Sequence, residues 1–297
     1  MNEVTEINKI KSWIIAARPR TLPAAVVPVI VGSTAAYSDN KFILLNAFIA
    51  LLCSLLIQIG TNFTNDLYDY LKGADNVKRK GPLRVMVNGL ITVKEMKAGI
   101  AIVFLSAFIL GLYLVYSGGI FVLLIGIASI LAGIAYTAGP YPLAYNGLGD
   151  LFVFMFFGIV GTVGTYYVQA HSLTYLPFLC SIPVGALITN ILVVNNYRDI
   201  DEDRAANKYT LAVKFGRSFT RYQFIFLLFI SFIIPLILFI GFEFSYWVFL
   251  PYFTIPMAYN LAKMLYSYEG KDLNRTLELT AKFLAIFGLL FSAGILL

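Results

Sequence analysis

The sequence predicts an all-α integral membrane protein, a bundle of about nine transmembrane helices with its N-terminus in the cytoplasm. Three observations support this fold class. First, 59% of the 297 residues are hydrophobic and only 13% are charged, whereas a soluble domain has roughly 25% charged residues. Second, the apolar residues form runs close to the ~20 residues that a helix needs to cross a bilayer. Third, the lysines and arginines gather in a few loops, which is typical of an oriented membrane protein.

Nine segments approach the length of a membrane span. The third and fourth are separated by Ser117-Gly118-Gly119, which is typical of a tight turn. Pro23 and Pro28 predict a kink in the first span, and Pro251 and Pro256 predict one in the eighth. The segments cover roughly residues 21–37, 42–64, 96–116, 119–137, 150–170, 174–195, 222–241, 244–266 and 279–297.

The positive charges predict the orientation. Of the 22 Lys and Arg residues, 21 lie before the first span or around the loops after spans two, six and eight, and only Lys41 lies on the other side. The positive-inside rule places the N-terminus and these loops in the cytoplasm, so we expect a multi-pass protein of the cell inner (cytoplasmic) membrane. The net charge of +6 is explained by this orientation, and we expect no nucleic-acid partner.

Two polar clusters occur where spans two and six end. In the first, Asn62, Asp66 and Asp69 are spaced i, i+4 and i+7, so a continuous helix places them on one face. In the second, Asn195 precedes two aspartates at i+4 and i+8, again on one face. Charged groups near membrane depth are rare and usually functional. A solvated loop that merely ends a helix explains one such cluster more easily than two at equivalent positions.

The composition of the clusters indicates a metal–diphosphate site. Carboxylate oxygens select Mg²⁺ over softer metals, and Mg²⁺ typically combines a few carboxylates with water and substrate phosphates. Lys and Arg surround both clusters and can meet phosphate oxygens. The equal four-span offset between the clusters also suggests an internal duplication, spans 1–4 and 5–8, within a single domain covering residues 1–297.

These motifs resemble the UbiA superfamily of intramembrane prenyltransferases. The first family motif, Asn-Asp-x-x-Asp, corresponds to residues 65–69 with Asp75, and the second, Asp-x-x-x-Asp, to residues 199–203. Further stretches are similar to the branch that prenylates 1,4-dihydroxy-2-naphthoate for menaquinone biosynthesis: Arg18-Pro19-Arg20-Thr21-Leu22-Pro23, Lys72-Gly73-Ala74-Asp75, Gly81-Pro82-Leu83-Arg84, residues 139–150 and Lys208-Tyr209-Thr210-Leu211-Ala212. Asn207 and Val87-Asn88-Gly89 depart from the usual family residues at loop positions.

The resemblance implies a Mg²⁺-dependent transfer of a polyprenyl group from its diphosphate to 1,4-dihydroxy-2-naphthoate, giving demethylmenaquinone and releasing diphosphate and CO₂. It implies metal-binding and catalytic roles for Asp66, Asp69, Asp199 and Asp203, with Asp75 as a further metal ligand. Candidates for the diphosphate are Asn62, Asn65, Lys72, Arg79, Arg84, Asn195 and Arg198. Candidates for stabilising an allylic cation through their rings are Tyr68, Tyr136, Tyr141, Tyr145 and Tyr197.

Other functions stay open at this stage. A UbiA-type enzyme acting on 4-hydroxybenzoate, homogentisate or a lipid carries the same acidic motifs. A secondary transporter can also contain repeats and intramembrane carboxylates, although its site lies near the midplane on broken helices. Here the span centres are uncharged and the acids gather at one set of helix ends. We expect the lipid bilayer, a polyprenyl diphosphate and an aromatic acceptor as partners, and the sequence leaves the oligomeric state open.

Overall fold

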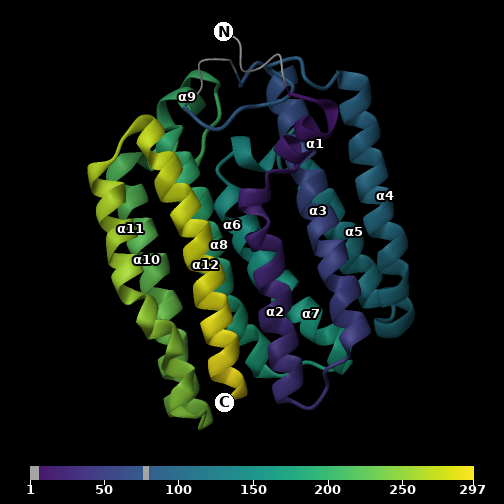
Figure 1. Cartoon of the computed structure of the whole chain (residues 1–297), viewed down its shortest axis with the longest axis vertical. Coiled ribbons are helices and arrows are strands. Elements are labelled where there is room, and N and C mark those ends of the chain that lie inside the picture. Colours follow the sequence, from purple (N-terminus) through teal and green to yellow (C-terminus); the bar gives the residue numbers. More distant parts are fainter. Residues whose placement is uncertain (1–6, 76–79) are drawn as a thin grey trace.

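The computed structural model describes residues 7–75 and 80–297, and within these ranges every regular element is a helix. Short helices cap or interrupt longer ones, and Figure 1 shows the long ones packed side by side. The longer helices are α2 (Pro23–Ser38), α3 (Leu44–Leu71), α4 (Val93–Gly118), α5 (Ile120–Ala135), α7 (Gly161–Ala170), α8 (Tyr175–Arg198), α10 (Leu211–Phe242), α11 (Ile255–Ser267) and α12 (Leu273–Leu296). The shorter elements are α1 (Lys9–Ala17), η1 (Pro19–Thr21), η2 (Leu143–Tyr145), α6 (Gly149–Val153), η3 (Phe154–Val160), α9 (Ile200–Ala205), η4 (Tyr246–Thr254) and η5 (Gly270–Asp272).

The prediction of nine crossings is confirmed in part. Among the described residues, six helices are long and apolar enough to span a membrane, and a seventh is added if the bent pair Lys9–Thr21 and Pro23–Ser38 counts as one span. The two other predicted spans coincide with helices that are too short to count alone. One is α5, with 16 residues, and the other is divided into η4 and α11.

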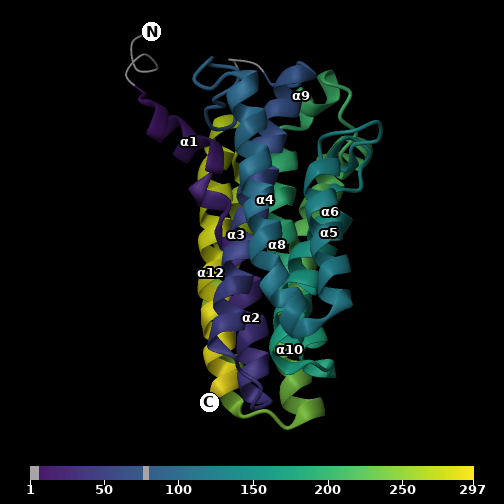
Figure 2. The ribbon, with the colours of Figure 1, turned by 90° about the vertical axis from the view of Figure 1, so that its right-hand side faces the viewer.

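The chain bends sharply before its first long apolar helix. The segments Lys9–Thr21 and Pro23–Ser38 meet at 51°, and Figure 2 shows α1 projecting sideways from one end of the bundle. Arg18, at the end of α1, has a left-handed backbone with φ of 52°. Pro23 begins α2, where a proline costs no hydrogen bond. At the bend, Asn62 of α3 donates a hydrogen bond to the Ala17 carbonyl, and the Thr21 hydroxyl of η1 donates one to the Arg18 carbonyl.

Helix α8 lies at the centre of the bundle and is the most buried of the candidate spans. It packs closely against η3, where a Cβ added to Gly158 would come within 2.5 Å of the Gly185 Cα atom. Small residues allow such close approach between membrane helices. On its other side, α8 shares a core with Phe283, Phe287 and Phe291 of α12, which are all fully buried.

Both polar clusters lie at one end of the bundle. Figure 1 shows α9 and the end of α3 near the N-terminus, and the C-terminus at the opposite end. The backbone N–H of Lys80, in the loop after α3, donates to a Glu202 side-chain oxygen of α9 at 3.0 Å. The same-end arrangement predicted from the charges is therefore confirmed, while its assignment to the cytoplasm stays a prediction.

Candidate active site

The last three turns of α3 bury the polar face that the spacing predicts. Asn62, Asp66 and Asp69 are 3%, 2% and 5% exposed. The Asn62 amide nitrogen donates to the Ala17 carbonyl at 2.9 Å, which ties α3 to the bend before α2. Asp66 accepts from the Val85 backbone N–H at 3.3 Å through one oxygen, and its Oδ1 atom is buried without a hydrogen-bond partner. These contacts hold α3 against both neighbouring loops.

Asp69 is the centre of the first cluster. Its Oδ1 atom accepts from the Tyr145 hydroxyl at 2.8 Å, and its Oδ2 atom lies 3.7 Å from Arg84. Arg84 also forms an ion pair with Asp75 at 3.0 Å. The structure thus brings together Asp69, Asp75 and Arg84, three residues that sequence analysis assigned to the metal and the diphosphate.

The second cluster is organised around Arg198, which is 1% exposed. Its guanidinium donates two hydrogen bonds to the Asp199 carboxylate, at 2.6 and 2.7 Å. It also donates to side-chain oxygens of Asn195 and Asn274, both at 2.8 Å. Asn274 in turn donates to the Lys80 carbonyl at 2.9 Å. Arg198 therefore joins α8, the acidic cluster, α12 and the loop after α3.

Asp203 and Lys208 form a buried pair beside Arg198. The Lys208 ammonium lies 3.3 Å from the Asp203 carboxylate. Burial raises the pKa of Asp203 to about 6, although Lys208 opposes that shift. Burial lowers the pKa of Lys208, but the carboxylates of Asp203, Asp69 and Asp199 outweigh it and raise that pKa above its ordinary value. Lys208 is therefore a cation that the two acidic clusters share.

Tyr145 connects the two clusters. Its hydroxyl bonds to Asp69, and the Lys72 and Lys208 ammonium groups lie 4.4 and 5.7 Å from its ring centre. Lys72 also donates to the Thr137 carbonyl at 2.6 Å, and the Thr137 hydroxyl donates to Asn65 at 2.8 Å. Among the predicted diphosphate ligands, Arg79 lies outside the described residues.

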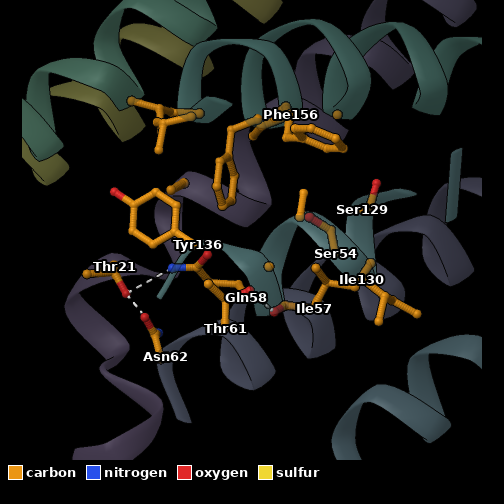
Figure 3. Close-up of a pocket in the computed structure, with 18 of the residues that line it drawn as sticks. Thr21, Ser54, Ile57, Gln58, Thr61, Asn62, Ser129, Ile130, Tyr136 and Phe156 are labelled. Atoms are coloured by element: carbon orange, nitrogen blue, oxygen red, sulfur yellow. Dashed lines mark hydrogen bonds between the residues drawn. The ribbon is translucent and has the colours of Figure 1, made fainter. Parts of the chain in front are cut away.

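A cavity of about 680 Å³ opens between the two clusters and continues along the bundle. Its polar end is lined by groups from both clusters, namely Asn62, Asn65, Asp69, Arg84, Asn195, Arg198 and Lys208. Its remaining wall is mostly apolar and reaches Val115 and Val122, where α4 ends and α5 begins, far from the acidic end. Figure 3 shows Gln58, Thr61 and Asn62 of α3 facing Tyr136 and Phe156 across part of this space.

The donor set suits a hard divalent cation. In the described part of the chain, no three His, Cys, Asp or Glu side chains converge as a metal cluster. Arg84, Arg198 and Lys208 form ion pairs with Asp69, Asp199 and Asp203. However, Asp66 Oδ1 and Asp203 Oδ2 are buried without hydrogen-bond partners. Unsatisfied buried carboxylate oxygens are costly, and a Mg²⁺ ion with oxygen ligands would satisfy them.

The aromatic candidates occupy different places. Tyr145 lies between the clusters, whereas Tyr141 is 61% exposed. Tyr68 packs against the cluster of Phe63 and Val85 beside α1. Tyr197 is fully buried beneath two arginines of α10. None of these four is among the residues that line the described cavity, and the aromatic ring that faces its polar end is Tyr136.

Sequence analysis missed three residues that the structure adds to the site. Asn274 has no motif around it, because only the approach of α12 to α8 brings it to Arg198. Lys208 belongs to a stretch that supported the resemblance but was assigned no role. Gln58 lies one turn before Asn62 on the same face of α3, and this i, i+4 spacing is the signal that could have identified it.

The chain matches the UbiA prenyltransferase family over residues 25–287. It is 35% identical to a Haemophilus influenzae protein named 1,4-dihydroxy-2-naphthoate octaprenyltransferase, with 97% of each chain covered. It is 37% identical to the Escherichia coli protein of the same name, over 98% of this chain and 97% of that one. A solved UbiA homologue from Archaeoglobus fulgidus, bound to DMAPP and Mg²⁺, has a TM-score of 0.65 at 16% identity, covering 95% of this chain and 99% of the other. This last likeness supports the fold.

Proposed function

The chain belongs to the UbiA prenyltransferase family, and we propose that it transfers a polyprenyl group from polyprenyl diphosphate to 1,4-dihydroxy-2-naphthoate. The products are diphosphate, CO₂ and the prenylated hydroquinone, demethylmenaquinol. The demethylmenaquinone expected from the sequence is two electrons more oxidised, so it forms only when a separate oxidant acts on this product. One observation supports this function above the others: a single cavity joins a polar end, lined by Asp69 of the first cluster and by Asn195 and Arg198 of the second, to a long apolar wall. Such a space accommodates a substrate with a charged head and a hydrocarbon tail.

The polar end would hold the diphosphate. Asp66, Asp69, Asp199 and Asp203 would hold Mg²⁺, with Asp75 beside them, and the ion, when bound, neutralises charge on the leaving diphosphate. Lys72, Arg84 and Lys208 would contact the phosphate oxygens, the arginine through two parallel N–H groups and the lysines as point charges. Arg84 pairs with Asp69 and Asp75, and Lys208 pairs with Asp203, so substrate binding would exchange these ion pairs for contacts with phosphate oxygens.

The apolar part of the cavity would hold the tail and exclude water. As the bond between the allylic carbon and the diphosphate oxygen breaks, positive charge develops on that carbon, and water would quench it. The Tyr136 ring lines the cavity near its polar end, and an aromatic face stabilises such a charge by ~0.5–2 kcal/mol. We place Tyr136 in this role ahead of the other four tyrosines considered from the sequence. The electron pair for the new carbon–carbon bond comes from the acceptor ring.

The same proposal includes the topology. We propose nine crossings, with α5 and the η4–α11 pair each counted as one, and both acidic clusters on the cytoplasmic side of the inner membrane. The segregation of 21 of 22 basic residues supports this orientation. A water-soluble diphosphate product would then leave directly into the cytoplasm, while the prenylated product would stay in the bilayer.

An acceptor panel tests the function. Purified chain in lipid nanodiscs is mixed with octaprenyl diphosphate, Mg²⁺ and either 1,4-dihydroxy-2-naphthoate, 4-hydroxybenzoate or homogentisate, and products are separated by chromatography. We expect product with the naphthoate and at least about tenfold less with the other acceptors. Product with 4-hydroxybenzoate alone would contradict the acceptor and keep the reaction class. No product with any acceptor would contradict both.

The length of prenyl tail that the enzyme accepts is expected to depend on glycines of the apolar cavity wall. Gly126 of α5 lines the cavity, and a Cβ added there meets no atom within 4 Å, so a larger side chain would fill open space. We expect Gly126→Leu to lower kcat/KM for octaprenyl diphosphate at least about tenfold relative to geranyl diphosphate, a difference of ~1.4 kcal/mol. The ratio of the two values is measured with one acceptor.

Gly241→Leu is the matched control for this substitution. Gly241 is also a helical glycine with open space around it, but it lies near the end of α10 and does not line the described cavity. It should leave the ratio unchanged. Equal loss for both tail lengths in Gly126→Leu would show that the residue affects folding or the polar end instead of the space for the tail.

A further inference from the structure

Gln58 is a buried polar residue in the cavity wall that the proposed reaction has not yet used. It projects from α3 and is 7% exposed. Its amide nitrogen donates to the Thr21 hydroxyl oxygen at 3.3 Å, whereas its Oε1 atom is buried and has no hydrogen-bond partner. Both Gln58 and Thr21 line the cavity, and Figure 3 shows the Gln58 amide beside the Tyr136 ring.

The orientation of this amide follows from the hydrogen bonds of Thr21. A hydroxyl group has one donor and two acceptor positions. Thr21 donates to the Arg18 carbonyl at 3.0 Å, and its oxygen already accepts from Asn62 at 3.2 Å. Only an acceptor position is left for Gln58, so Gln58 must present its nitrogen to Thr21. Its oxygen is thereby turned away from Thr21.

The chain bend is what fixes this arrangement. At the turn between α1 and α2, the Asn62 amide donates to the Ala17 carbonyl, and the Arg18 carbonyl accepts from both the backbone N–H and the hydroxyl of Thr21. The donor capacity of Thr21 is used by the bend itself. An alternative in which Gln58 is flipped would place its oxygen against a hydroxyl that has no hydrogen left to donate.

A buried acceptor without a partner favours a ligand that supplies a hydrogen-bond donor, since leaving such a group unsatisfied is costly. The two proposed substrates differ in this respect. A polyprenyl tail has no donor, and an ionised diphosphate has only acceptors. A dihydroxynaphthoate has two hydroxyl donors. Gln58 also lies one turn, ~6 Å, beyond Asn62 in the direction away from the acidic end, where a ring placed against the allylic carbon would lie.

We infer that Gln58 positions the aromatic acceptor, its Oε1 atom accepting a hydrogen bond from one acceptor hydroxyl while Thr21 and Asn62 hold the amide in place. This inference rests on the proposed prenyl transfer and adds to it the group that recognises the hydroxyl. Arg18 and Arg20, which line the same cavity, lie on the neighbouring wall at the bend and suit the acceptor carboxylate.

The test compares ligands that lack one hydroxyl. With the wild-type chain in nanodiscs, KM is measured for 1,4-dihydroxy-2-naphthoate. The inhibition constants of 1-hydroxy-2-naphthoate and 4-hydroxy-2-naphthoate are then measured as competitive inhibitors of its prenylation. The same measurements are made for Gln58→Met, which keeps the length of the side chain and removes the amide. Ser54→Ala is the matched control, because Ser54 lies one turn earlier on α3, lines the same cavity and donates to the Ala25 carbonyl.

We expect one of the two monohydroxy ligands to bind wild type about 10- to 100-fold more weakly than the dihydroxy compound. The Gln58→Met variant should bind that monohydroxy ligand and the dihydroxy compound about equally, and its KM for the prenyl diphosphate should be unchanged. The Ser54→Ala variant should keep the wild-type difference in affinity between the two ligands. A purely structural role for Gln58 would weaken all ligands alike and would overturn the inference.

The wild-type measurements decide the question even if Gln58→Met does not fold. If wild type binds both monohydroxy ligands as tightly as the dihydroxy compound, no hydroxyl is recognised and the inference is wrong. The absence of any prenylated naphthoate in wild type is a different result, because it contradicts the proposed function itself.

Discussion

Asp69→Asn is expected to lower kcat for prenyl transfer by on the order of 10²–10³-fold, the range seen when one preorganised electrostatic group is removed from an active site. Asp69 is buried, lines the cavity and faces both Arg84 and Tyr145. The amide keeps the shape and still accepts from the Tyr145 hydroxyl, but it removes the negative charge that a metal ion requires. The rate is measured at saturating substrates over a range of Mg²⁺ concentrations.

Asp201→Asn is the matched control for Asp69→Asn. Asp201 belongs to the second acidic cluster in sequence, but its side chain is 59% exposed and forms ion pairs with Arg217 and Lys80 at 3.1 and 3.7 Å. Exposed ion pairs of this kind contribute little, so the rate should change less than about twofold. Near-wild-type turnover by Asp69→Asn would contradict the assignment of Asp69 as a metal ligand.

Arg198→Lys is expected to impair stability and activity together. The guanidinium donates four hydrogen bonds, to Asp199, Asn195 and Asn274, and a lysine ammonium cannot reproduce this planar fork. Breaking a buried charge pair costs about 3–5 kcal/mol. We expect a clearly lower unfolding temperature in detergent and, at a temperature where the variant is folded, a loss of kcat of at least about tenfold because Asp199 is no longer held in place.

Arg217→Lys serves as the comparison for Arg198→Lys. Arg217 lies close by on α10, where its side chain is 36% exposed and pairs with the exposed Asp201. The same change of residue type there should leave the unfolding temperature nearly unchanged. If Arg198→Lys behaved like Arg217→Lys, the hydrogen bonds that join α8 to α12 would not stabilise the site.

Much of the site could be predicted because it is encoded locally. Asn62, Asp66 and Asp69 are at helical spacing, and the structure buries all three. The charge pattern likewise predicted that both acidic clusters share one end of the bundle, which the contact between Lys80 and Glu202 confirms. Helical spacing and the positive-inside rule need no knowledge of how the helices pack.

The features that were missed depend on packing. Asn274 reaches Arg198 only because α12 lies beside α8. Tyr136 was one of five tyrosines considered, and only the packing of α5 against α3 singles it out as the one that lines the cavity. The sequence also contains 19 Tyr, 25 Phe and 2 Trp, with no local signal to separate the rings that face the cavity from those that face lipid. Pro23 predicted a kink in the first span, and the chain does bend where Pro23 begins α2. The left-handed backbone of Arg18, which helps to orient Thr21 and Gln58, is a conformation that no motif predicts.

The central claim is that both acidic clusters act through Mg²⁺ on one prenyl diphosphate. It is tested most directly by following diphosphate release and prenylated naphthoate together, with purified chain in nanodiscs, first in Mg²⁺, then in excess EDTA, and finally after Mg²⁺ is restored. We predict equal amounts of both products in Mg²⁺, loss of both in EDTA and recovery of both on restoration. Undiminished product formation in EDTA would contradict the account.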